Sequence, residues 1–424
     1  MSDRFRRYGD IYRAVIYGAN VYVSRDPQHA EHVLRENWQC YTKGLFSKRV
    51  AILLGNGLMS SEGTLWKNQR RMIQPAFHRN VVAGLTKVIA SSNRSLLKKW
   101  KEAALQHIQV NVTRDISSMI LEVTLAAIFG NDYQRVAEHF NVLSEEPTRD
   151  LKFAQAFRSL QKIVFLIAAE RRKKNPESND LLSKLMTARD LSGQPMRDPQ
   201  LVNEIKTLIV AGHETTASTL NWVWYLLSRN PEAQDRLWEE VDERTPGDAT
   251  DLDRLDEYPF AREVIEETMR LFPPGWLVTR KALSDDQLGE FFVPAGTEIY
   301  VPLYFIQRNP KLWEDPDRFD PDRFTPERSK NRHPFAMLPF SAGPRRCIGE
   351  SLARVEMLMH VVTIAKGLRL RFVGRAPELD PAVNLRNKHD FLMEPEVRSE
   401  PAADLISECQ ACIDRPSAGH PSGD

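Results

Sequence analysis

One cysteine near the end of the chain has the most restrictive surroundings in the sequence. Residues 340–349 read FSAGPRRCIG, which fills every fixed position of the pattern F-x-x-G-x-R-x-C-x-G around Cys347. Zinc needs four ligands at close spacing, and no such cluster surrounds this cysteine. Gly343 and Gly349 allow the backbone to turn tightly and to approach a large flat group. The pattern predicts a single axial thiolate; the alternative, a structural cysteine before a helix, is disfavoured by the complete match.

A helix is predicted directly after this loop. Residues 350–366 place apolar side chains at helical spacing, namely at Leu352, Val355, Met359 and Val362. Cys347 then precedes a helix N-terminus, where free N–H groups and the helix dipole favour the thiolate form. Arg345 adds a positive charge suited to an acidic group of a cofactor.

The remaining sequence predicts one domain that is mostly α-helical with small β sheets. The 424 residues allow two domains by length, but no internal repeat or convincing linker divides them. Short β-branched runs occur at residues 11–17, 21–24, 291–293 and 297–301. Amphipathic periodicity predicts helices over residues 64–79, 81–102, 110–129, 154–173, 199–228, 231–244 and 258–271.

Charge, hydropathy and cysteine usage argue against a nucleic-acid-binding, a membrane-spanning and a secreted protein. A net charge of +1 gives no indication of a nucleic-acid or acidic-membrane partner. No apolar run reaches the roughly 18–20 residues of a membrane span, and the first residues contain no signal-peptide core. A cytoplasmic protein without a transmembrane anchor is expected, and its four cysteines agree with a reducing compartment. Cys409 and Cys412 form a C-x-x-C inside a tail, residues 399–424, that is expected to be disordered rather than a zinc or redox site.

The cysteine loop resembles the haem-binding loop of the cytochrome P450 family. The resemblance implies a P450-like domain over residues 1–398 and haem b as the cofactor, with Cys347 as the axial iron ligand. It also implies that Arg345 pairs with a haem propionate, that Phe340 packs beside the thiolate, and that Gly349 belongs to the cofactor-binding loop. A proximal thiolate pushes electron density to the iron and favours O–O cleavage.

A second motif interrupts an apolar helix with polar groups. Residues 208–217 read LIVAGHETTA, in which Gly212 and Thr215 are poor choices for a helix interior. A threonine hydroxyl can bond to a carbonyl of the preceding turn and loosen the helix into a bulge, a feature common at functional sites. The alternative is a helix that passes from buried to exposed. The segment resembles the family's A-G-x-[D/E]-T motif, which implies that Thr215 hydrogen-bonds dioxygen and that Glu214 relays protons, whereas His213 occupies a variable position and has no ligand role.

A third motif joins a carboxylate to two arginines. Glu267 and Arg270 form E-x-x-R, an i,i+3 pair that is common on solvated helices. Residues 271–274 and 313–324 resemble the family's K helix and meander, which implies a supporting network of Glu267, Arg270 and Arg323.

Haem anchoring is implied by further matches to the family pattern. Trp66 and Arg70 fit W-x-x-x-R, and Arg280 takes the place of another propionate arginine. For each of these residues alone, an ordinary surface position is the alternative. Three arginines would neutralise the two buried carboxylates of the cofactor.

Two departures from the family pattern are expected. The chain begins almost at the first predicted strand, without the proline-containing leader and first helix of relatives. Residues 130–180 also leave less room than relatives use for two long helices over the substrate channel.

The resemblance implies a haem–thiolate monooxygenase that inserts one oxygen atom from O2 into an apolar molecule such as a fatty acid, a terpenoid or a similar lipophile. No G-x-G-x-x-G follows a predicted strand, so electrons from NAD(P)H must arrive through a separate ferredoxin or flavodoxin-type partner and its reductase. Lys67, Arg71 and Arg346 are candidates for docking that partner. The alternatives are a peroxide-using or isomerising relative, and a non-catalytic haem or lipophile-binding protein. Candidate substrate contacts, for which core packing is the alternative, are Phe46, Leu53, Leu58, Val210, Ala211, Trp276, Leu277 and Val278.

Overall fold

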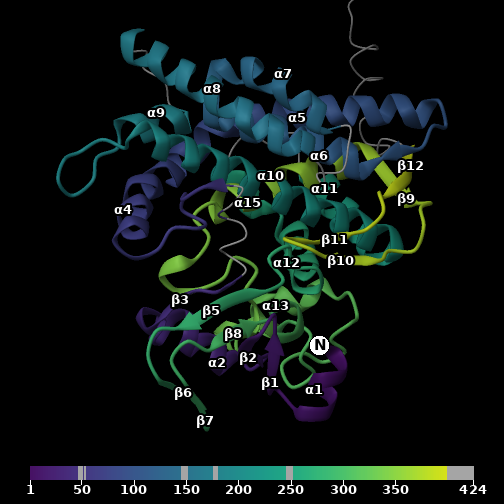
Figure 1. Cartoon of the computed structure of the whole chain (residues 1–424). Coiled ribbons are helices and arrows are strands. Elements are labelled where there is room, and N and C mark those ends of the chain that lie inside the picture. Colours follow the sequence, from purple (N-terminus) through teal and green to yellow (C-terminus); the bar gives the residue numbers. More distant parts are fainter. Residues whose placement is uncertain (46–50, 52–53, 145–150, 175–179, 245–251, 399–424) are drawn as a thin grey trace, which may run out of the picture.

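Helices make up most of the molecule, and the computed structural model describes residues 1–45, 51, 54–144, 151–174, 180–244 and 252–398 (Figure 1). The longer helices are α4 (Gly63–Ile73), α5 (Arg79–Leu105), α6 (Val112–Phe129), α7 (Tyr133–Ser144), α8 (Leu151–Lys174), α9 (Leu181–Thr187), α10 (Asp198–Arg229), α11 (Pro231–Glu243), α12 (Pro259–Leu271) and α15 (Glu350–Gly367). The short helices are α1 (Ser2–Tyr8), α2 (Pro27–Glu31), α13 (Leu303–Ile306) and α14 (Pro326–Ser329). The expected fold class, mostly α with small β sheets in a single domain, is confirmed.

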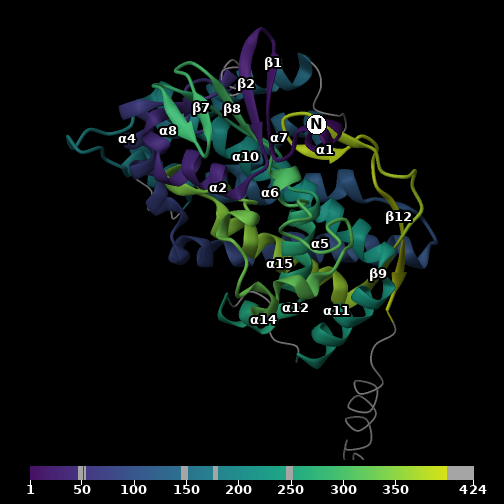
Figure 2. The same ribbon diagram turned by 90° about the horizontal axis from the view of Figure 1, so that it is seen from below.

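The hydrophobic core is organised around α10, which runs through the middle of the helical body in Figures 1 and 2. Its side chains contribute to two core clusters, one shared with α5, α12 and α15 and one shared with α6 and α9. Trp222 of α10 is buried and stacks on Phe272 with ring centroids 3.8 Å apart. Burying a large apolar side chain contributes about 1.5–3 kcal/mol, so a helix that is apolar on most of its sides is held firmly in place.

A five-stranded sheet lies at the end of the molecule that carries the N-terminus (Figure 1). The strands of the fold are β1 (Ile11–Ile16), β2 (Ala19–Ser24), β3 (Tyr41–Lys43), β4 (Val110–Asn111), β5 (Val278–Ala282), β6 (Asp286–Leu288), β7 (Phe291–Val293), β8 (Glu298–Val301), β9 (Leu368–Phe372), β10 (Leu379–Pro381), β11 (Leu385–Asn387) and β12 (Leu392–Val397). The large sheet has the order β1-β2-β8-β5-β3, in which β2 and β8 are parallel and the other neighbours antiparallel. The two strands of the predicted patch at 291–301 therefore separate, because β7 pairs with β6 and β8 joins the large sheet.

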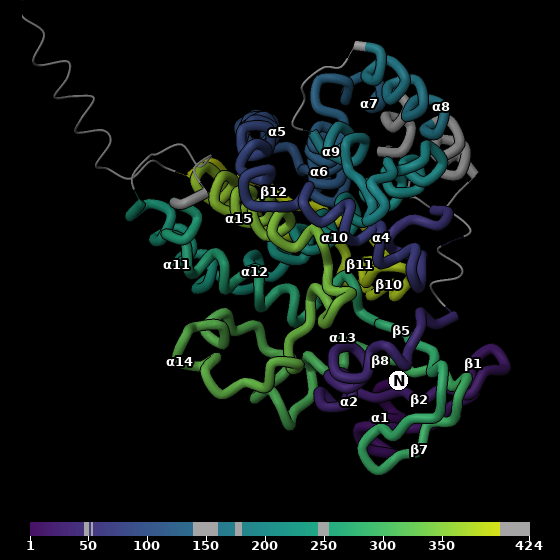
Figure 3. Tube along the Cα trace, turned by 90° about the vertical axis from the view of Figure 1, so that its left-hand side faces the viewer, coloured from purple at the N-terminus to yellow at the C-terminus, as the bar shows by residue number. Residues whose placement is uncertain are grey.

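The meander before the cysteine loop runs along the side of the molecule opposite to the β1–β2 hairpin. Figure 3 places α14, which lies in this meander, far from β1. The loop 340–349 follows the meander and leads into α15.

One expectation about the N-terminal half needs correction. A first helix does precede the first strand, since residues 2–8 form α1 and bury Phe5. Residues 130–180, expected to leave less room than relatives use for two long helices, form α7 and α8, of 12 and 24 residues, and the comparison with relatives stays a prediction. The tail 399–424, including Cys409 and Cys412, lies outside the described residues. Within the described ranges, no helix is both long and apolar enough to cross a membrane.

Candidate active site

The loop that carries Cys347 folds back on itself. The Cys347 backbone N–H donates to the Phe340 carbonyl oxygen at 2.9 Å, which closes the loop. Ser341 and Gly343 have positive φ values of 59° and 69°. A Cβ atom at residue 343 would lie 1.9 Å from the Leu34 carbonyl oxygen, so only glycine fits this contact. The geometry explains why the motif requires glycine four residues before the cysteine.

The Cys347 side chain is accessible, although protein surrounds it at longer range. Burial raises the pKa of the Cys347 thiol, while a hydrogen bond from the Gly349 backbone N–H and the charges of Arg70 and Arg346 act in the opposite direction. The expected stabilisation of the thiolate by the N-terminus of α15 is therefore present through Gly349 but is outweighed by burial. Coordination to a metal cation deprotonates a thiol outright, so the Cys347 sulfur is suited to bind a metal cation as a thiolate.

Helix α4 presents Trp66 and Arg70 on one face, because they are four residues apart. Arg70 Nη1 donates to the Arg346 carbonyl oxygen at 2.6 Å, so this arginine binds the backbone of the cysteine loop. The Trp66 ring lies under the Arg345 guanidinium, 4.2 Å from the ring centroid, and contacts Trp38 edge-on. The W-x-x-x-R motif therefore places Trp66 against the side chain of Arg345, and it places Arg70 against the main chain of the cysteine loop.

Three cations lie close to the carboxylate of Glu62, and Glu204 also acts on one of them, Lys43. Arg345 forms an ion pair with Glu62, and burial followed by the charge of Arg345 lowers the pKa of Arg280 to about 10. Burial, again followed by Arg345, lowers the pKa of Lys43 to about 7. Within the described part of the chain, Arg345 Nη1 is buried and has no hydrogen-bond partner. Such a site is short of negative charge, and it fits the carboxylates of a haem.

The middle of α10 is partly exposed, although the helix is buried on either side of it. Residues 210–215 are half-buried, whereas Ile209 and Thr216 are buried. The Thr215 hydroxyl donates to the Ala211 carbonyl oxygen at 2.7 Å, which is the bond to the preceding turn that the sequence predicted. The expected bulge is absent from this segment, because α10 is a continuous α-helix from Asp198 to Arg229.

The two residues next to Thr215 have partners on different elements. Asn384, in the turn between β10 and β11, donates from Nδ2 to Glu214 Oε2 at 2.9 Å. His213 points to α6, where its Nε2 lies 2.8 Å from the Ser117 hydroxyl, and burial lowers its pKa. The carboxylate of Glu214 is therefore held by an amide, while His213 is engaged by the neighbouring helix.

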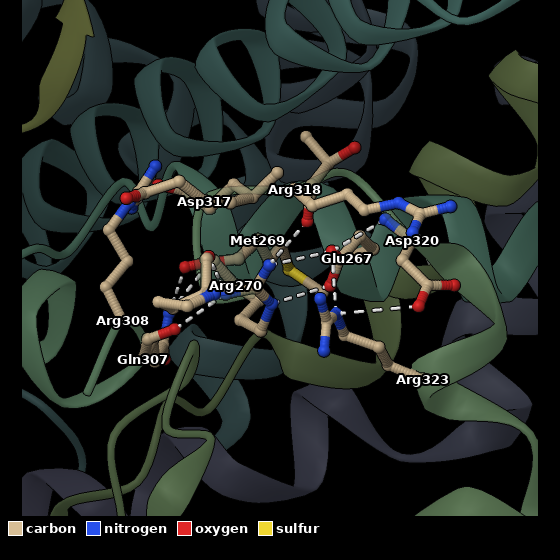
Figure 4. A network of polar contacts seen from close by, with 12 residues as sticks. Glu267, Met269, Arg270, Gln307, Arg308, Asp317, Arg318, Asp320 and Arg323 are labelled. Atoms are coloured by element: carbon tan, nitrogen blue, oxygen red, sulfur yellow. Dashed lines mark hydrogen bonds and ion pairs between the residues drawn. The ribbon is translucent and has the colours of Figure 1, made fainter. Parts of the chain in front are cut away.

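The structure brings Glu267, Arg270 and Arg323 together (Figure 4). Arg270 donates from Nε and Nη2 to the two carboxylate oxygens of Glu267 at 2.6 and 2.7 Å. Arg323 Nε lies 3.5 Å from Glu267 Oε1. The three side chains are at most 5% exposed, so the cluster is a buried ion network.

The network continues toward the cysteine loop through Gln307. Arg270 Nη1 donates to the Gln307 carbonyl oxygen at 2.8 Å, and Gln307 Nε2 donates to the Met269 and Arg270 carbonyl oxygens at 2.9 and 3.0 Å. The Leu338 N–H donates to Gln307 Oε1 at 2.9 Å, two residues before the loop begins. The sequence motifs missed Gln307, as they missed Lys43, Glu62 and Asn384, because none of these residues belongs to a recognised pattern.

The candidate substrate contacts do not all lie together. Val210 and Ala211 belong to the half-buried part of α10, and Trp276 Nε1 donates to the Ala382 carbonyl oxygen at 3.2 Å. Leu277 packs against the N-terminal cluster that contains Phe5, so ordinary core packing accounts for it. Leu58 and Val278 also pack against core clusters, and Phe46 and Leu53 lie outside the described residues.

Comparison with known proteins agrees with this architecture. The family model for cytochrome P450 matches residues 1–143 and 134–395. The chain is 32% identical over 386 residues to the cyclooctat-9-en-7-ol 5-monooxygenase of Streptomyces melanosporofaciens, covering 86% of this chain and 83% of that protein. It is 26% identical over 415 residues to the Arabidopsis thaliana protein LUTEIN DEFICIENT 5, chloroplastic, covering 89% and 70%. The structure of retinoic acid-bound cyanobacterial CYP120A1 has the same fold, with a TM-score of 0.85 at 24% identity over 94% of both chains.

The chain belongs to the cytochrome P450 family. The protein is accordingly an oxidoreductase, a P450 monooxygenase that binds haem through a cysteine thiolate and receives electrons originating from NAD(P)H through a partner protein.

Proposed function

We propose that the protein inserts one oxygen atom into a terpenoid-like lipophile, with Cys347 as the haem ligand and a ferredoxin or flavodoxin-type protein as its electron donor. The observation that carries this proposal is the combination of an accessible thiol in a closed loop with the Glu214–Thr215 pair on the half-buried part of α10. One oxygen atom of O2 enters a C–H or C=C bond, and the other leaves as water after two electrons and two protons are supplied.

The residues that would hold the cofactor come from three parts of the chain. Cys347 supplies the thiolate, and the Gly349 N–H stabilises the charged sulfur. Arg345 and Arg280 supply positive charge for the carboxylates, and Trp66 packs on Arg345. When bound, a haem with a thiolate ligand supplies the oxidising chemistry, because the thiolate favours O–O cleavage.

Glu214 and Thr215 supply the proton path in this proposal. The Thr215 hydroxyl already has one partner in the Ala211 carbonyl oxygen, so its oxygen remains able to accept a second hydrogen bond. Asn384 fixes one carboxylate oxygen of Glu214 and leaves the other to accept a proton from the solvent side. A short acid–alcohol pair delivers protons while the apolar neighbours Val210 and Ala211 limit the entry of water.

The electron donor would bind at the face that carries the cysteine loop. Lys67 and Arg71 on α4 are exposed, and so is Arg346 beside Cys347. Arg346 pairs with Glu350 at 2.7 Å and keeps three of its five N–H donors available. Exposed cations of this kind attract an acidic partner and increase its association rate at low ionic strength.

Two observations support the proposed substrate class: the apolar character of the candidate contacts on α10 and the names of two relatives. The candidate contacts on α10 are apolar, which fits a lipophile. One relative is named for the oxygenation of cyclooctat-9-en-7-ol, an unsaturated alcohol, and a second is named cyclooctatin synthase. A terpenoid-like substrate is therefore favoured over a fatty acid.

The test begins with the absorption spectrum of the dithionite-reduced protein under carbon monoxide. A red-shifted Soret band typical of a thiolate ligand supports the assignment of Cys347, and a band typical of histidine or of a protonated thiol contradicts it. The same preparation is then titrated with terpenoid alcohols and with fatty acids, and the spin-state shift is recorded. Turnover of a terpenoid with ferredoxin, its reductase and NAD(P)H is expected; product with peroxide alone would indicate a peroxide-using enzyme.

A further inference from the structure

A π-helix lies directly against the cysteine loop. Residues His32–Glu36 form this helix, which continues α2. It packs on the 3₁₀ turn Gly343–Arg345, and its Leu34 carbonyl oxygen fills the space that a Cβ atom at residue 343 would need. π-Helices are rare and occur frequently at functional sites. Because packed interiors transmit displacements, a shift of this helix would move the loop at a point four residues before Cys347.

The same helix contributes to the hydrophobic core next to the loop. Val33 and Leu34 are buried and belong to one cluster with Phe335 and Leu338. Ala342, at the beginning of the loop, packs against this cluster. Apolar packing therefore joins the π-helix to the cysteine loop in addition to the contact of its main chain.

His32 fixes the π-helix to the β6–β7 hairpin. Its Nε2 lies 2.9 Å from Asp286 Oδ2, and the Tyr41 hydroxyl donates to the same oxygen at 2.5 Å. Burial by itself raises the pKa of Asp286, but hydrogen bonds that begin with those of Tyr41 and His32 outweigh burial and lower the pKa below its ordinary value. An ionised carboxylate only accepts hydrogen bonds, so His32 Nε2 is the donor. The side chains of His32 and Asp286 are 27% and 12% exposed, so the contact is largely shielded from water.

A second set of contacts joins this segment to the meander before the loop. Arg35 pairs with Glu31 of α2, and its guanidinium lies 5.0 Å from the ring centroid of Phe335. His333 Nε2 lies 3.6 Å from Glu31 Oε2. These contacts tie the segment to the meander, whereas His32 ties it to β6.

We propose that His32, anchored by Asp286, is a positioning residue for the Cys347 thiolate. This inference rests on the haem assignment of the proposed function and adds two residues that lie outside the sequence motifs. His32 acts through the π-helix, because the contact between Leu34 and Gly343 passes the position of the helix to the loop. Without this anchor the loop relaxes, the bond between sulfur and iron breaks, and the sulfur keeps its electron pair and takes a proton from solvent.

The experiment follows thiolate ligation directly by absorbance. The full chain is loaded with haem, reduced with dithionite and saturated with carbon monoxide, and the red-shifted Soret band is followed as it gives way to the band of a protonated thiol. His32→Leu is expected to lose the red-shifted band about tenfold faster than the wild-type protein, equivalent to ~1.4 kcal/mol, since a hydrogen bond to a charged group is removed. His32→Gln keeps an N–H donor and is expected to stay within about twofold of the wild-type rate. His32→Asn, whose side chain is shorter, replaces His32→Leu if that variant does not fold.

Asp10→Ala is the matched control for Asp286→Ala. Asp10, directly before β1, also binds two side chains, Arg25 at 2.8 Å and Lys311 at 2.6 Å, and it is 15% exposed against 12% for Asp286. Urea unfolding measures the effect of each change on the whole fold. Asp286→Ala is expected to accelerate the loss of the band, whereas Asp10→Ala is expected to leave its rate unchanged. The double variant His32→Leu/Asp286→Ala is expected to lose the band no faster than Asp286→Ala, because both changes remove the same contact.

Three results would overturn the inference: a wild-type rate in His32→Leu, equal acceleration in Asp10→Ala and Asp286→Ala, or effects of His32→Leu and Asp286→Ala that multiply in the double variant. A wild-type chain that never shows the red-shifted band overturns the ligand assignment of the proposed function, and the role of His32 with it. That result is distinct, because it is seen before any variant is compared.

Discussion

Replacing Glu267 with glutamine tests how strongly the buried network stabilises the fold. In Glu267→Gln the two arginines lose their common counter-charge while neither can reach water, since Arg270 is 0% exposed and Arg323 is 5% exposed. Arg270 also remains fixed by the carbonyl oxygens of Gln307, Pro316 and Arg318 at 2.8, 2.7 and 3.1 Å. Removing one partner of a buried ion pair costs about 3–5 kcal/mol, which is a large part of a typical unfolding free energy of about 5–15 kcal/mol. The glutamine oxygen can still accept one bond, so a loss of ~3 kcal/mol is expected.

The assay is urea unfolding followed by tryptophan fluorescence, with haem content measured in the same samples. Asp322→Asn is the matched control, because Asp322 also binds an arginine through both oxygens, at 2.8 and 3.0 Å from Arg236. That pair is 40% and 49% exposed, so its loss is expected to cost less than about 1 kcal/mol. Equal losses in the two variants, or a loss below about 1 kcal/mol in Glu267→Gln, would refute the argument from burial.

Three further predictions concern the site. Cys347→Ala is expected to abolish the red-shifted Soret band of the reduced carbon monoxide complex, whereas Cys40→Ala, at the other cysteine that the structure describes, leaves it unchanged; a band that persists in Cys347→Ala would disprove the ligand assignment. Thr215→Ala is expected to retain haem but to divert electrons to hydrogen peroxide, with product per NAD(P)H falling tenfold or more, since a positioned proton donor contributes on the order of 10²–10⁴-fold. Thr219→Ala, which loses a similar bond of 3.1 Å to the Thr215 carbonyl oxygen, is the control, and equal coupling in the two variants would argue against a proton role. Burial, followed by the charge of Arg345, lowers the pKa of Lys43 to about 7 from its ordinary 10.5, so the folded haem-free chain binds fewer protons than the unfolded chain between these pH values. Its unfolding free energy therefore rises with pH in this window, by up to ~1.4 kcal/mol per pH unit, and that contribution is lost as the pH falls through 7. Urea unfolding at pH 7.5 and 9.5 should show a smaller slope in Lys43→Met than in the wild-type protein, and identical slopes would contradict the linkage.

Local patterns in the sequence predicted most of the helices, because a helix is built from contacts three and four residues apart. The predicted segment 199–228 corresponds to α10 and the segment 231–244 to α11. Helix α9 was missed because its seven residues span fewer than two turns, which is too short for periodicity to show. The sheet was harder to predict, since β8 pairs with β2 from the opposite end of the chain rather than with the adjacent β7.

For the candidate site too, some residues could be predicted from the sequence and others could not. Residues within short motifs, such as Cys347 and Thr215, could be named from spacing alone. Lys43 and Asn384 lie in segments without a motif and reach the site only because β3 pairs with β5 and because the β10–β11 turn lies against α10. Nothing in their neighbouring residues indicates a partner more than 150 positions away in the chain.

The pairing of β2 with β8 determines when this protein can complete its fold during synthesis. Val21 is aligned with Glu298, and Val23 with Tyr300, across about 275 residues of intervening chain. At ~5–20 residues per second, the ribosome needs on the order of 15–55 seconds to make that segment. During this time the β1–β2 hairpin has emerged, but the edge of β2 has no strand to accept its hydrogen bonds, and Val21 and Val23 are not yet covered. An unpaired apolar strand edge is a site of aggregation, so the nascent hairpin is exposed to aggregation until β8 has been made.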